Sequence, residues 1–82
     1  NHRKKKFIEK TFIKNIELIK LFPNNKVLLN TFYDLSKTLE YNDWNLFFEL
    51  MLYNKNNLKK KLIELDMNTK DYNLKKIINI YI

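Results

Sequence analysis

The chain carries few of the side chains that usually do chemistry. His2 is the only histidine and Ser36 the only serine among its 82 residues. A metal site or a proton-transfer pair needs partners held at fixed geometry, and His2 has no cysteine and no second histidine to work with. Ser36 has no histidine available as a base, so we expect its hydroxyl on the surface or lining a groove. Neither residue predicts a catalytic or metal site.

The absence of glycine and cysteine from the sequence excludes further chemistries. Loops that cradle phosphates need glycine so that backbone N–H groups can approach the anion closely. Thiolate nucleophiles, disulfides and thiolate metal sites need cysteine. We therefore predict no catalytic, cofactor-binding or metal-binding residues and expect no small-molecule substrate.

Paired carboxylates are the remaining candidates for acid–base chemistry. Asp34, Glu40, Asp43 and Glu49 lie in the middle third of the chain. Their spacing places no two of them on one face with the apolar surround that general acid–base catalysis uses. Helix capping and solvation explain them, and a deep pocket lined by two or more of them would contradict this interpretation.

Charge is the one positive signal. Residues 1–26 carry eight Lys or Arg and two acids, residues 27–54 carry one and four, and residues 55–82 carry seven and three. Lys6, Lys10 and Lys14 are spaced so that they form a ridge on one helical face, although like charges at this spacing are mildly destabilising. The ridge is our candidate partner-binding surface, for phosphates or for an acidic protein. The alternative is a solvated face in a lysine-rich chain.

The biased composition of the chain makes the lysine excess weaker evidence for a binding surface. Lys, Asn, Ile, Phe and Tyr supply 48 of the 82 residues, and Ala and Gln are absent as well as Gly and Cys. This bias is typical of an AT-rich nuclear or organellar genome, and it favours an intracellular or organellar protein without fixing the compartment. Arg3 is the only arginine, so the bidentate contacts that grip phosphate or read guanine are nearly unavailable.

Hydrophobic spacing predicts five helices, over residues 5–21, 26–40, 44–53, a short helix around residues 58–65, and a last element ending at residue 82. Pro23 ends the first helix. Asn24 and Asn25 supply the turn and the cap before the second helix, Asn42 or Asp43 caps the third, and Asn68 with Asp71 resembles a capping arrangement. The end of the chain, residues 77–82, is rich in β-formers, but no other segment offers a strand partner, so we predict a helix.

The third helix is apolar nearly all round, which is typical of a central helix contacted on several sides. We expect Trp44 to be buried with Phe48 and Met51 beside it. The predicted core is Phe12, Ile16, Leu28, Phe32, Leu35, Trp44, Phe47, Phe48, Met51, Leu62 and Ile78.

The predicted fold class is all-α, a small bundle of about five helices arranged as successive helical hairpins. A shift of 30 residues superimposes the hydrophobic pattern of residues 28–51 on that of residues 58–81, so a short α-solenoid fragment is the alternative. We expect one domain over residues 1–82, with residues 1–5 a flexible basic terminus. The chain does not begin with Met, which indicates a piece of a longer protein.

These features predict a non-enzymatic helical module that binds or braces another macromolecule within a larger protein or assembly. A protein is the expected partner. The alternative is a basic RNA- or DNA-binding module, such as a small ribonucleoprotein component. A weaker third alternative is attachment to an anionic membrane surface through the first helix. No segment predicts a membrane span, since the longest apolar stretch, residues 46–53, is short and contains Glu49.

Overall fold

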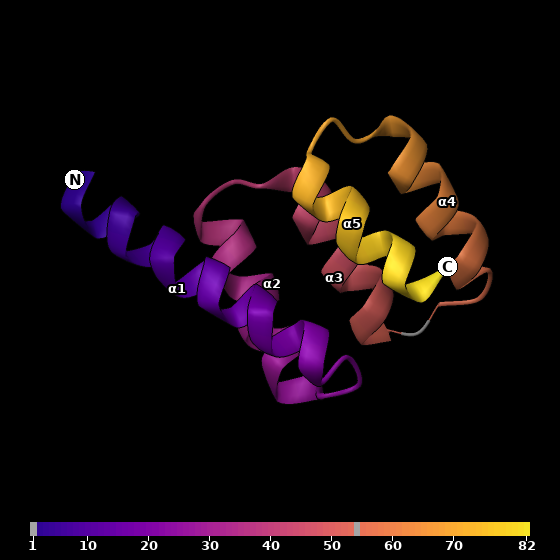
Figure 1. Cartoon of the computed structure of the whole chain (residues 1–82), viewed down its shortest axis with the longest axis horizontal. Helices are drawn as coiled ribbons and strands as arrows, with labels where there is room; N and C mark the ends of the chain where they lie inside the picture. Colours follow the sequence, from indigo (N-terminus) through magenta and orange to yellow (C-terminus); the bar gives the residue numbers. More distant parts are fainter. Residues whose placement is uncertain (1, 54) are drawn as a thin grey trace.

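The computed structural model describes residues 2–53 and 55–82, with the side chains of residues 2 and 3 excepted, and within them the chain forms five helices and no strand (Figure 1). In chain order they are α1 (His2–Leu21), α2 (Lys26–Thr38), α3 (Asn42–Tyr53), α4 (Leu58–Asn68) and α5 (Tyr72–Tyr81). Each helix packs against the next, and α3 also contacts α5. The predicted all-α bundle of successive helices is confirmed, and the molecule measures 38 × 25 × 18 Å.

Helix boundaries differ from the expectation at several ends. Helix α1 begins at His2, so residues 2–5 are helical where we expected a separate flexible terminus, and Asn1 lies outside the described residues. Helix α2 ends at Thr38 and α3 already begins at Asn42, because a tight turn joins them. The strand alternative for residues 77–82 is wrong, since α5 continues to Tyr81.

Asparagine and aspartate side chains start two of the helices. Oδ1 of Asn25 accepts hydrogen bonds from the backbone N–H groups of Val27 and Leu28, which caps α2 as predicted. For α5 the cap is Asp71 rather than Asn68, because Asn68 is still the last residue of α4. Each cap satisfies backbone donors that have no partner inside the helix.

The turn between α2 and α3 shows how this chain manages without glycine. Glu40 has a φ of 60°, the left-handed conformation in which glycine usually follows a helix. The backbone N–H of Tyr41 donates to the carbonyl of Ser36, and that of Glu40 donates to the carbonyl of Lys37. These two bonds form the Schellman motif, so a residue with a Cβ occupies a position that costs it conformational energy.

The core centres on an aromatic cluster contributed by α1, α2 and α3. Ring centroids lie 5.3 Å apart for Phe12 and Trp44, 5.3 Å for Phe32 and Phe48, and 5.2 Å for Phe47 and Phe48. Of the residues expected in the core, the structure buries Phe12, Phe32, Trp44, Phe47, Phe48, Leu62 and Ile78. It leaves four partly exposed and packed against that core, namely Ile16, Leu28, Leu35 and Met51.

Burial follows the 30-residue shift closely. Trp44, Phe47 and Phe48 of α3 correspond to Leu74, Ile77 and Ile78 of α5, and all six side chains are buried. The correspondence extends to the connections between helices, where Leu39 and Thr69 are both buried. The pairs α2–α3 and α4–α5 therefore share most of their burial pattern, although the buried Leu29 corresponds to the exposed Lys59, and α1 packs against α2.

Candidate functional site

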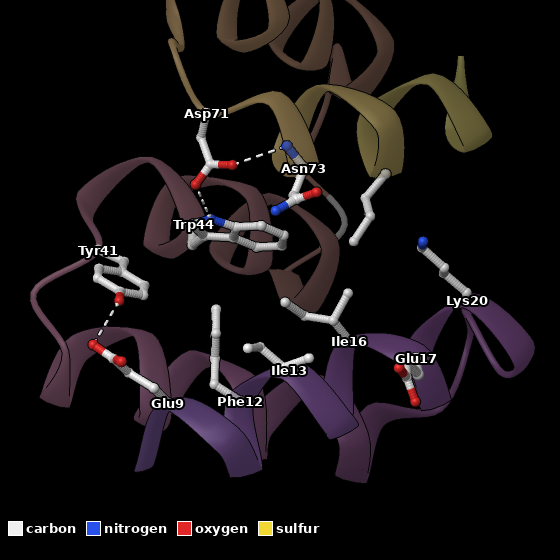
Figure 2. Close-up of a pocket in the computed structure, with 11 residues that line it drawn as sticks. Glu9, Phe12, Ile13, Ile16, Glu17, Lys20, Tyr41, Trp44, Asp71 and Asn73 are labelled. Carbon is white, nitrogen blue, oxygen red and sulfur yellow. Dashed lines mark hydrogen bonds between the residues drawn. The ribbon is translucent and has the colours of Figure 1, made fainter. Parts of the chain in front are cut away.

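A groove lies between α1 and α5, with Trp44 of α3 at its base (Figure 2). Its volume is about 390 Å³. Helix α1 forms one wall with six side chains, while α5 and its N-terminal turn form the other. The lining residues are Glu9, Phe12, Ile13, Ile16, Glu17, Lys20, Tyr41, Trp44, Asp71, Asn73 and Ile77.

The floor of the groove is apolar and belongs to the core. Phe12, Trp44 and Ile77 are buried, and the rings of Phe12 and Trp44 meet edge to face. Above them, Ile13 is 58% exposed and Ile16 is half-buried, and Figure 2 shows both side chains pointing from α1 toward the indole. An exposed isoleucine over an apolar floor offers surface that a partner can remove from water.

Two hydrogen bonds fix the walls. The phenol of Tyr41 donates to Oε1 of Glu9 at 3.3 Å, and the indole Nε1–H of Trp44 donates to Oδ2 of Asp71 at 2.7 Å (Figure 2). Burial raises the pKa of Tyr41, and the negative charge of Glu9 raises that pKa further. The phenol thus stays neutral and holds its hydrogen bond to Glu9 across the physiological range.

The charged rim of the groove has the sign opposite to that of the whole chain. Three carboxylates line it, Glu9, Glu17 and Asp71, against the single ammonium group of Lys20. The chain as a whole carries a formal charge of +7. A cationic ligand therefore finds a locally favourable site on a protein that otherwise repels it.

The candidate lysine ridge lies elsewhere. Lys6, Lys10 and Lys14 are all exposed on α1, on the side opposite the buried Phe12 and Ile19. None of the three lines the groove. Helix α1 therefore presents an acidic, apolar side to the groove and a basic side to solvent.

A second hollow, of about 380 Å³, lies between α3 and α4. Two of the four mid-chain carboxylates, Asp43 and Glu49, line it together, because α4 brings a second wall that spacing within one helix does not reveal. Glu49 accepts from Nζ of Lys55 at 2.7 Å, and Asp43 accepts from the hydroxyl of Thr69 at 2.6 Å. Most lining side chains are exposed, so the hollow is open and both carboxylates already have partners.

Ser36 is buried, so the expectation of a surface or groove hydroxyl is wrong. Its Oγ lies 2.8 Å from the carbonyl oxygen of Tyr33 and 2.5 Å from the side-chain amide of Asn45, which joins α2 to α3. The sequence carried a signal for this, because Phe32, Ser36 and Leu39 share one helical stripe. The hydroxyl is a structural tie between helices.

Sequence reasoning missed Glu9, Tyr41 and Asp71 as site residues. They come from three separate segments, and no spacing rule connects positions 9 and 71. The side chain of His2 lies outside what the structure describes. In residues 2–53 and 55–82, no group of three or more His, Asp or Glu side chains is placed to hold a metal ion.

Comparison of the chain with protein-family models, curated proteins and solved structures finds no match. Function is therefore argued from the geometry of the groove and of the surfaces around it.

Proposed function

We propose that this chain is a non-enzymatic interaction module that receives a helical segment of a protein partner in the groove between α1 and α5. The observation that carries the proposal is the groove itself, an apolar floor under Ile13 and Ile16 with a rim of three carboxylates and one lysine. The partner segment is an amphipathic helix with a large apolar side chain flanked by Lys or Arg.

The dimensions suit such a partner. A volume of about 390 Å³ accommodates one or two large side chains, and the exposed lining residues Ile13, Glu17 and Asn73 leave the groove accessible from solvent. An amphipathic helix laid into a groove inserts residues spaced three or four apart as anchors. Ile13 and Ile16 have the matching spacing on α1.

The rim sets the polarity of the partner. Glu17 is exposed and free to move toward a cation, while Glu9 and Asp71 are held by Tyr41 and Trp44. Preorganised carboxylates around an apolar floor favour Lys or Arg over Asp or Glu on the partner, because like charges at an interface cost several kcal/mol.

The same contacts support a binding role over catalysis. No His, Cys or Ser is among the residues lining the groove, so nucleophile–base pairs are not available there. The hydrogen bonds of Glu9 and Asp71 serve the fold, since one joins α1 to the start of α3 and the other joins α3 to α5.

The test uses three synthetic amphipathic peptides with the same apolar face and a polar face of Lys, Ser or Glu. We expect the lysine peptide to bind with the highest affinity and the glutamate peptide with the lowest, measured by calorimetry or fluorescence anisotropy. Equal affinity of the three peptides, or binding of none at millimolar concentration, contradicts the proposal.

Matched variants locate the binding site. Ile13→Asp and Glu17→Lys alter exposed groove residues, and each should weaken the lysine peptide by about tenfold or more. The controls are Ile80→Asp, at a residue 54% exposed on α5, and Asp34→Lys, at an exposed residue of α2, and both should leave affinity within about twofold. Similar losses in groove and control variants would show that the peptide binds without using the groove.

A further inference from the structure

We propose that the solvent-facing side of α1 is a second docking surface, and that it binds an anionic lipid membrane. We call this surface the basic face and define it by three lysines and three apolar residues, all exposed: Lys6, Phe7, Lys10, Lys14, Leu18 and Leu21. On a helical wheel these residues occupy one arc opposite the buried Phe12 and Ile19, and the exposed Glu17 falls within that arc, so the three lysines outnumber one carboxylate there. The surface is separate from the groove, since none of these six residues lines it.

The lysines of the basic face are available to an external anion. Among the described side chains, none of Lys6, Lys10 and Lys14 lies within ion-pair distance of a carboxylate, whereas Lys55 pairs with Glu49. Their spacing brings three positive charges together on one helical side at a cost to the helix. An anionic surface that neutralises them relieves that repulsion.

The apolar members of the face are unusually exposed. Phe7 is 71% exposed, Leu21 70% and Leu18 41%, and Phe22, directly after the helix, is 55% exposed. Phe7 lies among the lysines in the N-terminal part of the helix, and Leu18 and Leu21 follow Lys14 at its C-terminal end, so the face is mixed toward its beginning and mainly apolar toward its end. Lysines reach outward while aliphatic side chains enter the boundary between headgroups and acyl chains.

The mixture favours a membrane over a nucleic acid. Phosphates of RNA or DNA pair with lysine, and Phe7 has a ring that can stack on a base, but Leu18 and Leu21 have none and gain little beside a sugar–phosphate backbone. Leu18 and Leu21 gain hydrophobic free energy only where binding transfers them from water into an apolar environment. A bilayer surface supplies both the anionic headgroups and that phase.

The position of α1 in the fold suits this role. Figure 1 shows α1 along one edge of the molecule, with its N-terminal turns projecting beyond the other helices. A helix of 20 residues is about 30 Å long, so it can lie flat on a surface without disturbing α2 to α5. None of the helices in the described part of the chain is long and apolar enough to cross a membrane, so the attachment we propose is peripheral.

Flotation with vesicles tests the proposal. Vesicles of phosphatidylcholine mixed with phosphatidylserine should carry the protein to the top of a density gradient, and vesicles of phosphatidylcholine alone should not. Replacing Lys6, Lys10 and Lys14 with Gln should lower the partition coefficient by roughly 100-fold, which is about fivefold for each lysine. Leu21→Ser should lower it by about fivefold or more at unchanged net charge.

Two controls distinguish binding through the basic face from nonspecific electrostatic or hydrophobic adsorption to the vesicles. Replacing the exposed Lys59, Lys60 and Lys70 with Gln removes the same charge from the other end of the molecule, and Met67→Ser removes an apolar side chain that is 76% exposed on α4. Both should leave vesicle binding nearly unchanged. Equal losses in the two lysine triples, or no loss with Leu21→Ser, overturn the proposal.

The same proteins should be titrated with a single-stranded RNA oligonucleotide at several salt concentrations. The basic face would be assigned to nucleic acid instead if the protein bound RNA more tightly than vesicles, if that affinity fell steeply with salt, and if Leu21→Ser left it unchanged. Weak RNA binding together with leucine-dependent vesicle binding supports the membrane.

Discussion

The indole Nε1–H of Trp44 donates a hydrogen bond of 2.7 Å to Oδ2 of Asp71, and this bond joins the central helix α3 to the beginning of α5. The other carboxylate oxygen of Asp71 caps α5 by accepting from the backbone N–H groups of Asn73 and Leu74. Thr69 extends the same arrangement, since its hydroxyl donates to Asp43 and accepts from the backbone N–H of Asp71. One side chain therefore fixes both the start of a helix and the base of the groove.

Asp71→Ala should lower the free energy of unfolding by about 2–3 kcal/mol, because it removes a helix cap and leaves a buried indole N–H without its partner. Asp71→Ser keeps a capping oxygen but cannot reach the indole, so we expect it to recover about 1 kcal/mol of the loss. Urea unfolding followed by circular dichroism measures all three proteins. Equal stability of the alanine and serine variants would contradict the double role of Asp71.

Trp44 is the only tryptophan in the sequence, so its fluorescence reports on the base of the groove alone. The side chain is 3% exposed and packs against Phe12, Phe47 and Phe48. We expect blue-shifted emission and little quenching by iodide, and Trp44→Ala should cost about 3–5 kcal/mol of stability. Red-shifted emission that iodide readily quenches would mean that α3 is an exposed interaction surface.

Glu40→Gly should stabilise the protein. Glu40 occupies the left-handed position of the turn after α2, where a Cβ costs about 1 kcal/mol or more and glycine does not. The matched control is Glu64→Gly in the middle of α4, which should lower stability by about 1 kcal/mol because glycine disfavours a helix interior. Thermal unfolding of the two variants should give shifts of opposite sign, and a loss of stability in both would contradict the role of the turn.

Tyr81→Phe should also stabilise the protein, by about 1 kcal/mol, because the Tyr81 hydroxyl is buried without a hydrogen-bond partner among the described residues. Tyr53→Phe, at a residue 64% exposed, is the control and should change stability little. A loss of stability in Tyr81→Phe would show that the hydroxyl has a partner in solution.

The same tyrosine predicts how stability depends on pH. Burial raises the pKa of Tyr81 above its usual value of 10.0, so the folded state holds the phenol proton more tightly than the unfolded state. The contribution of Tyr81 to the free energy of unfolding is therefore complete below pH 10, and it is lost as the pH rises above 10 through the raised pKa of the folded state. Tyr81→Phe should lessen this alkaline fall, and Tyr41→Phe should do the same, since burial and Glu9 raise the pKa of Tyr41. An unchanged alkaline profile in both variants would contradict the assignment.

Helical spacing was enough to predict the helices and the central place of α3, because apolar stripes such as Phe32 and Leu39 directly mark buried faces. It was not enough to predict which of the adjacent residues Leu28 and Leu29 is buried. In the structure Leu29 is buried and Leu28 is partly exposed. That choice depends on the rotation of α2 against α1 and α3. The groove could not be predicted for a related reason, since Glu9 and Asp71 line one groove only once the helices have packed.

Chemical-shift mapping of the ¹⁵N-labelled protein, titrated with the lysine-faced amphipathic peptide, locates the binding site residue by residue. We expect the largest amide shifts on residues 9–20 of α1 and on residues 71–77, and we expect the indole N–H signal of Trp44 to move with them. The Ile13→Asp variant should show much smaller shifts at the same peptide concentration, in keeping with an affinity about tenfold or more weaker. Shifts centred on α2 or α4, with Trp44 unmoved, would contradict the claim that the groove between α1 and α5 is the binding site.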